Sequence, residues 1–86
     1  MSDQTEQNII LFLEENKPAG VAVARIDRNT DLIGSGVVDS FGIVGVIEFL
    51  EDHFGIVVDD ADIDPENFRT VDAIAAYVAT ARGDTR

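Results

Sequence analysis

Apolar residues recur at helical spacing in three stretches of the chain. The first stretch covers residues 2–16, and its apolar positions are Ile9, Ile10, Phe12 and Leu13. The run Lys17-Pro18-Ala19-Gly20 follows it. Proline cannot continue the helical hydrogen-bond ladder, and glycine readily adopts the left-handed conformation that ends a helix. We therefore expect a first helix that ends near Asn16.

The second stretch starts at Asp39-Ser40 and reaches about Phe54, just before Gly55. At 100° per residue, five apolar side chains share a face about 100° wide, as a core-facing helix requires. These side chains are Ile43, Val46, Ile47, Leu50 and Phe54. The edge of this face carries Ser40, Val44, Glu48 and Glu51, and Phe41 points further toward solvent.

Two more helices are predicted near the end of the sequence. Asp64 and Pro65 are typical of a helix cap and a first helical position, and they predict a short helix through Phe68. Thr70 is a candidate cap for a last helix that ends near residues 81–83. Its apolar positions are Val71, Ile74, Ala75 and Val78. We expect Tyr77 to pack its ring and expose its hydroxyl.

The connection over residues 17–39 is long for a compact domain and contains three glycines. Its scattered apolar anchors are Val21, Val23, Leu32, Ile33 and Val37. They predict an ordered loop, in which a helical turn over residues 22–27 stays an alternative. The fold class is therefore all-α: a four-helix bundle in one domain (1–86), with a long first loop and a short third helix. Helices one, two and four are expected to form the core, and helix three to bridge them.

Charge and composition reduce the number of functions that fit the sequence. Seventeen acidic and six basic side chains give a formal charge of −11, which disfavours nucleic acid and favours partners rich in Lys and Arg. The chain has no cysteine, so thiol chemistry would need an imported thiol. The first residues lack the pattern of a signal peptide, and no apolar run is long enough to enter a membrane. A cytoplasmic location without membrane insertion is expected.

Asp39-Ser40 is the strongest candidate for chemistry. A helix N-terminus carries free N–H groups and about half a positive charge, so a phosphodiester on Ser40 would be stabilised there. Asp39 can cap the same helix. The alternative is that Asp39 is an ordinary cap and Ser40 an ordinary first-turn residue, and the residues by themselves leave both interpretations open.

Three segments resemble acyl carrier proteins in order along nearly the whole chain. Residues 31–44, with a glycine, the apolar pair Val37-Val38 and then Asp39-Ser40, are similar to the family's Asp-Ser-Leu region. Residues 49–56 are similar to the end of its second helix, and residues 68–78 resemble its last helix. An Asp-Ser pair alone would carry little weight, but three segments at compatible spacing are specific.

The resemblance implies a carrier that is not itself an enzyme. Ser40 would receive 4'-phosphopantetheine from a phosphopantetheinyl transferase, with Asp39 as the helix cap of the motif. An adenylating ligase or acyltransferase would load the arm as a thioester, and a transferase, ketosynthase or tailoring enzyme would use the cargo. The implied docking surface consists of Phe41, Val44, Glu48, Glu51 and Asp52. The carrier is expected to be a monomer.

The sequence departs from fatty-acid carriers in the second helix. Gly42 and Gly45 stand where those carriers usually have acids, and Phe41 replaces the leucine. Each glycine costs roughly 1 kcal/mol relative to alanine in a helix, which indicates either close approach by a partner or the arm, or tolerated drift. In these positions the chain resembles stand-alone carriers of amino acids, D-alanine or specialised metabolites more than fatty-acid carriers, and the identity of the cargo stays open.

Three other functions each find some support in the sequence. Asp60, Asp62 and Asp64 alternate like calcium ligands, but Pro65 stands where a turn glycine is needed and Val71 where a glutamate is needed. A serine hydrolase would need a base near Ser40, and the only histidine, His53, lies about 20 Å along the same helix. An unmodified acidic adaptor would share the charge and the fold, and only modification of Ser40 separates it from a carrier.

The excess of negative charge predicts a salt-dependent stability. At low ionic strength the carboxylates repel one another in the folded state, and added salt screens this repulsion. The melting temperature should therefore rise between low and high salt, as followed by circular dichroism. An unchanged melting temperature would contradict this expectation.

Overall fold

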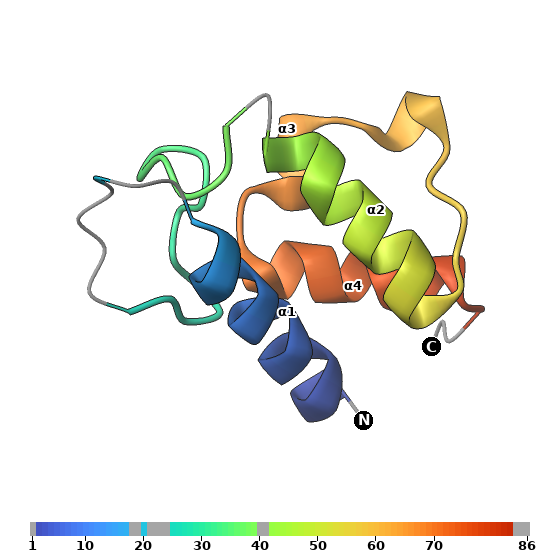
Figure 1. Cartoon of the computed structure of the whole chain (residues 1–86). Helices are drawn as coiled ribbons and strands as arrows, with labels where there is room; N and C mark the ends of the chain where they lie inside the picture. Colours follow the sequence, from blue (N-terminus) through green and yellow to red (C-terminus); the bar gives the residue numbers. More distant parts are fainter. Residues whose placement is uncertain (1, 18–19, 21–24, 40–41, 84–86) are drawn as a thin grey trace.

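The computed structural model describes residues 2–17, 20, 25–39 and 42–83. Within these residues the chain forms four α-helices, one short 3-10 helix and no strand. The elements are α1 (Ser2–Asn16), α2 (Gly42–Phe54), η1 (Asp60–Asp62), α3 (Pro65–Phe68) and α4 (Val71–Ala81). Figure 1 shows their arrangement. The predicted all-α class, with a long first connection and a short third helix, is confirmed.

The predicted helix signals operate as expected at α3 and α4. The Asp64 carboxylate accepts a hydrogen bond from the backbone N–H of Glu66, and Pro65 is the first residue of α3. The Thr70 hydroxyl accepts from the N–H of Ala73 and caps α4. Each bond satisfies a backbone donor that a helix start leaves without an intrahelical partner. Local sequence chemistry therefore fixes where both helices begin.

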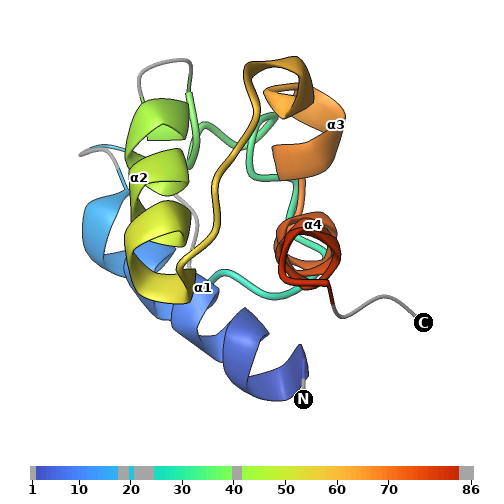
Figure 2. The same cartoon turned by 90° about the vertical axis from the view of Figure 1, so that its right-hand side faces the viewer.

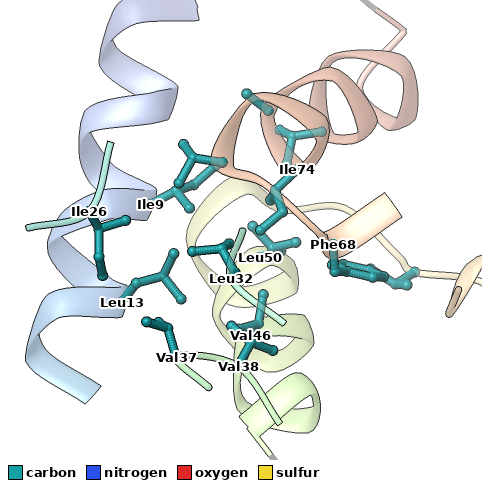
Figure 3. Packing of buried hydrophobic residues seen from close by; sticks show 14 of the residues in the cluster. Ile9, Leu13, Ile26, Leu32, Val37, Val38, Val46, Leu50, Phe68 and Ile74 are labelled. Carbon is teal, nitrogen blue, oxygen red and sulfur yellow. The ribbon is translucent and has the colours of Figure 1, made fainter. Parts of the chain in front are cut away.

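The core draws on all four helices. α1 and α3 each pack against α4, and α2 contributes Val46 and Leu50. The largest fully buried side chains are Phe68, Ile9, Leu32, Leu50, Ile74, Val38, Val71 and Val78, most of which are visible in Figure 3. Phe68 of α3 is completely buried, so this short helix supplies core volume and does more than bridge its neighbours.

The predicted apolar face of α2 packs at two depths. Val46 and Leu50 are buried, whereas Ile43, Ile47 and Phe54 are partly buried and pack against the edge of the core. Figure 2 shows α2 and α4 on opposite sides of the molecule, and Figures 1 and 2 together show that the segment leading to η1 runs along the end of the molecule where α2 ends. Within that segment Ile56 and Val58 are buried and Val57 is exposed. The connector therefore contributes two side chains to the core.

The connection before α2 is an integral part of the fold. Ile26, Leu32, Val37 and Val38 are buried in the core. The N–H of Leu32 donates to the carbonyl of Arg69 at 2.7 Å, and the N–H of Asp72 donates to the carbonyl of Arg28 at 3.1 Å. These bonds join the connection to both sides of the α3–α4 junction. The expected ordered loop is thus confirmed over residues 25–39.

Part of what the sequence predicts for this connection concerns residues that the structure does not describe. The anchors Val21 and Val23 lie outside the described residues, as does most of the alternative helical turn over residues 22–27. The described end of that turn, residues 25–27, is not helical. Ile26, which the pattern did not single out, is one of the buried anchors.

Tyr77 corrects one expectation. Its ring packs near Phe68, with a centroid separation of 6.1 Å. Its hydroxyl is not free in solvent, because it donates a hydrogen bond to a carboxylate oxygen of Asp62 at 3.0 Å. Burial, followed by this hydrogen bond, raises the pKa of Tyr77 above its ordinary value. The bond ties η1 to α4.

Among the described residues, no helix combines the length and the apolar character that crossing a bilayer requires.

The burial of the long connection can be tested at Leu32. Leu32→Ala should lower the free energy of unfolding by about 2–5 kcal/mol, because it removes a fully buried side chain and leaves a cavity. Urea denaturation followed by circular dichroism measures the change. Val57→Ala is the control, since the side chain of Val57 is 83% exposed and its loss should be close to neutral. Equal effects of the two substitutions would contradict the packing described above.

Candidate functional site

Asp39 makes both hydrogen bonds that define a helix cap. Its carboxylate accepts from the backbone N–H of Gly42 at 2.6 Å. Its backbone carbonyl accepts from the N–H of Ile43 at 2.9 Å, which is the first bond of the helical ladder. Asp39 is therefore the cap of α2, as the sequence predicts.

A tight turn places Asp39 at the surface. The N–H of Gly34 donates to the carboxylate of Asp31 at 2.9 Å. Gly36 has a φ of 86°, which only glycine adopts without strain. The chain then returns inward, where the N–H of Val38 donates to the carbonyl of Leu32 at 2.9 Å. Because Val37 and Val38 are buried, the next residue is held at the edge of the core.

The predicted attachment residue follows the cap directly in the sequence. Ser40 and Phe41 lie outside the described residues, so their predicted roles stay predictions. The first turn of α2 carries no acidic side chain, and the first acid after Asp39 in the sequence is Glu48. A negative group attached near this helix start would meet the helix dipole and the Asp39 carboxylate, which is already engaged with Gly42.

An open cavity lies beside this helix start. It has a volume of about 210 Å³ and lies between the last turns of α1, residues 37–38 and the first half of α2. The lining residues are Phe12, Leu13, Asn16, Val37, Val38, Gly42, Gly45 and Val46. The two unusual glycines of α2 therefore form one wall of a cavity. A Cβ added at Gly45 would meet no atom within 4 Å, so the side-chain position faces open space.

The predicted docking residues on α2 differ in their exposure. The side chain of Val44 is 53% exposed, and Glu48 and Asp52 are exposed as well. Glu51 is only partly exposed, and its carboxylate accepts a hydrogen bond from the backbone N–H of Val58 at 2.9 Å. Glu51 therefore holds the connector that follows α2, a structural role that the sequence did not indicate.

Aromatic side chains join α1 to α2 at the other end of the second helix. The rings of Phe12 and Phe49 stack with centroids 4.3 Å apart, and His53 stacks on Phe49 at 5.0 Å. Phe54 meets the imidazole edge-on at 4.8 Å. The helical pattern did not reveal this cluster, because Phe12 and Phe49 lie at the margins of their helices' apolar faces. His53 therefore packs among rings at the helix end far from Asp39.

The acidic run around η1 has structural partners. Asp59 accepts a hydrogen bond from the N–H of Ala61, Asp64 caps α3, and Asp62 accepts from the hydroxyl of Tyr77. Among the described residues, no group of three or more His, Cys, Asp and Glu side chains is arranged to hold a metal ion. Two of the three residues whose alternation resembled a calcium loop, Asp62 and Asp64, therefore have structural roles.

Comparison with known proteins gives a match that contains this site. Residues 19–78 match a family model described as "Phosphopantetheine attachment site". The match covers the cap Asp39, the following Ser40, the connection before them and the helices after them. A comparison with curated proteins finds no match.

The cap can be tested with two substitutions that remove the same charge. Asp39→Asn keeps an oxygen that can accept from the N–H of Gly42, whereas Asp39→Ala does not. The alanine variant should be less stable than the asparagine variant by about 1 kcal/mol in urea denaturation. Since both changes relieve the same charge repulsion, equal stability of the two would show that the cap contributes nothing.

Proposed function

The chain belongs to the phosphopantetheine attachment site family, and from this premise we propose that Ser40 carries the 4'-phosphopantetheine arm of a protein that holds acyl or aminoacyl groups for partner enzymes. The family attaches this prosthetic group, and its members act as carriers. The proposal adds the attachment residue, the kind of cargo and the surface that partners contact.

The capped start of α2 is the observation that carries the proposal. Asp39 accepts from Gly42 and Ile43 and so fixes the direction in which the helix begins. Ser40 is the next residue in the sequence, and α2 itself contains no residue with a hydroxyl side chain. Free N–H groups and the dipole of a helix start favour a phosphodiester at this place. Gly42 and Gly45, which form the cavity wall beside Asp39, leave room next to this helix start.

Attachment is a group transfer in which the chain supplies only the nucleophile. The oxygen of Ser40 bonds to the phosphorus that bears the pantetheine half of coenzyme A, and the pyrophosphate bond breaks. The adenosine bisphosphate half leaves, and the hydroxyl proton passes to the transferase. This chain has no cysteine and therefore no thiol of its own. When attached, the arm supplies the thiol that holds the cargo as a thioester.

The exposed side of α2 is the proposed docking surface. Val44, Glu48 and Asp52 are exposed there, Glu51 lies at its margin, and Phe41 belongs to it by sequence position. Apolar contact at Val44 and Phe41 would anchor a partner near the arm, while the carboxylates attract Lys and Arg. The formal charge of −11 adds a long-range attraction for basic partners. The proposed partners are a phosphopantetheinyl transferase, a loading ligase or acyltransferase, and an enzyme that uses the cargo.

Intact mass tests the attachment residue. The protein is incubated with coenzyme A, magnesium and a phosphopantetheinyl transferase of broad specificity. The wild type should gain the mass of one phosphopantetheine, and Ser40→Ala should gain none. Ser35→Ala is the matched control and should be modified like the wild type, because Ser35 is an exposed serine of the preceding turn.

A negative result has a definite meaning. If the transferase modifies another carrier in the same mixture but leaves this chain unchanged, the carrier function fails and an unmodified acidic adaptor is favoured. Modification of Ser40→Ala would place the arm on another residue.

A further inference from the structure

The turn that precedes Asp39 is held from two parts of the chain, and Asp31 takes part in both contacts. Its carboxylate accepts from the backbone N–H of Gly34 at 2.9 Å. The same carboxylate lies 3.7 Å from the guanidinium of Arg69, the residue that ends α3. The carbonyl of Arg69 in turn accepts from the N–H of Leu32 at 2.7 Å. The α3–α4 junction therefore contacts two consecutive residues of the turn.

The two partners of the Asp31 carboxylate contribute unequally. The side chains of Arg69 and Asp31 are 43% and 54% exposed, so water and dissolved ions weaken their attraction at this separation. Arg69 also lies closer to Glu66, at 3.2 Å. The bond from Gly34 is shorter and directional, and it joins a backbone donor to a charged acceptor. Asp31 therefore acts mainly through Gly34.

The close approach of Asp31 explains why residue 34 is glycine. A Cβ added at Gly34 would lie less than 3.0 Å from the Asp31 carboxylate, closer than real Cβ atoms come to their neighbours. Gly34 does not have the positive φ of Gly36, so its backbone conformation does not require glycine. The contact with the Asp31 side chain does.

A short path of hydrogen bonds leads from this contact to the start of α2. The residue after Asp31 is Leu32, and its carbonyl accepts from the N–H of Val38 at 2.9 Å. Asp39 comes next in the chain and accepts from the N–H of Gly42 at 2.6 Å. The place of the helix cap thus depends on how residues 31–38 are folded.

We propose, on the basis of the carrier function above, that Asp31 is a positioning residue, whose contact with Gly34 fixes the turn that places Asp39 and so presents the attachment motif to the transferase. The exposed docking residues lie further along α2, which Val46 and Leu50 hold to the core. Loss of the Asp31 contact should therefore leave binding of the transferase unchanged and slow the attachment step.

Amide hydrogen exchange measured by NMR tests the positioning without any partner. In Asp31→Ala, the amides of Gly42 and Ile43 should exchange about fivefold faster, because a typical hydrogen bond shifts an opening equilibrium by about that factor. Asp31→Asn keeps an acceptor oxygen and should stay close to the wild type. Asp59→Ala is the matched control, since it removes the same charge and a similar bond from Ala61. The amides of α4 report any general loss of stability.

A double substitution makes this test specific for the contact. Both residues are exposed, so the variants should fold. Gly34→Ala should displace the Asp31 carboxylate and speed the exchange of the same two amides. In the Asp31→Ala background it should have no further effect, because the side chain that it meets is gone. Additive effects of the two substitutions would overturn the contact as the cause.

The rate of arm attachment tests the functional part of the proposal. Intact mass is followed over time with coenzyme A, magnesium and the transferase at several concentrations of the carrier. Asp31→Ala should lower kcat about fivefold, in line with the weight of one hydrogen bond, while KM stays as in the wild type. Asp31→Asn should restore kcat, and Asp59→Ala should leave it unchanged.

The possible failures are distinguishable. If the wild type is not modified, the carrier function fails, and this proposal with it. If the wild type is modified and Asp31→Ala has the same kcat, the carrier function stands and Asp31 has no positioning role. A higher KM with unchanged kcat would make Asp31 a contact of the transferase and overturn the proposal. Unchanged exchange at Gly42 and Ile43 would also overturn it.

Discussion

Two main-chain hydrogen bonds join the connection before α2 to the start of α4, one from Leu32 to Arg69 and one from Asp72 to Arg28. They satisfy backbone groups near a fully buried leucine, so the connection cannot leave the core without exposing apolar surface and breaking these bonds. Val37 and Val38 are anchored in the same core (Figure 3), so Asp39 has a fixed place at its edge. The start of α2 is therefore positioned by a segment without regular secondary structure.

In α2, the residues that hold the helix to the core are separate from the first turns, which lie next to the attachment motif. The buried pair Val46 and Leu50 holds the helix to the core, while its first turns carry glycine and open space. A carrier needs such a division, because the residue that bears the arm must be accessible to several enzymes and yet directed by a rigid element. The low helix propensity of the first turns is offset by the Asp39 cap and by packing further along the helix.

Local signals in the sequence account for much of the fold. Chemistry within a few residues predicts the end of the first helix and the three helix caps, which are Asp39, Asp64 and Thr70. The path of residues 25–39 does not, because its bonds reach Arg69 and Asp72, more than thirty positions away in the sequence. The hydrogen bonds of Tyr77 to Asp62 and of Glu51 to Val58 span fewer positions, but they depend on how the segments around η1 fold back on α4 and α2, which the helical pattern does not indicate. The glycines of α2 were noticed as a departure, but only the packing of α1 beside them shows a cavity.

If this protein carries its prosthetic group on Ser40, the protein isolated from its own cells should show it there. Proteolysis followed by fragmentation mass spectrometry locates any added mass on the peptides. We expect one phosphopantetheine, carried by the peptide that contains Asp39-Ser40, with fragment ions that assign it to the serine. If this peptide is unmodified in all of the protein from growing cells, or if the phosphopantetheine is found on another residue, attachment at Ser40 is contradicted.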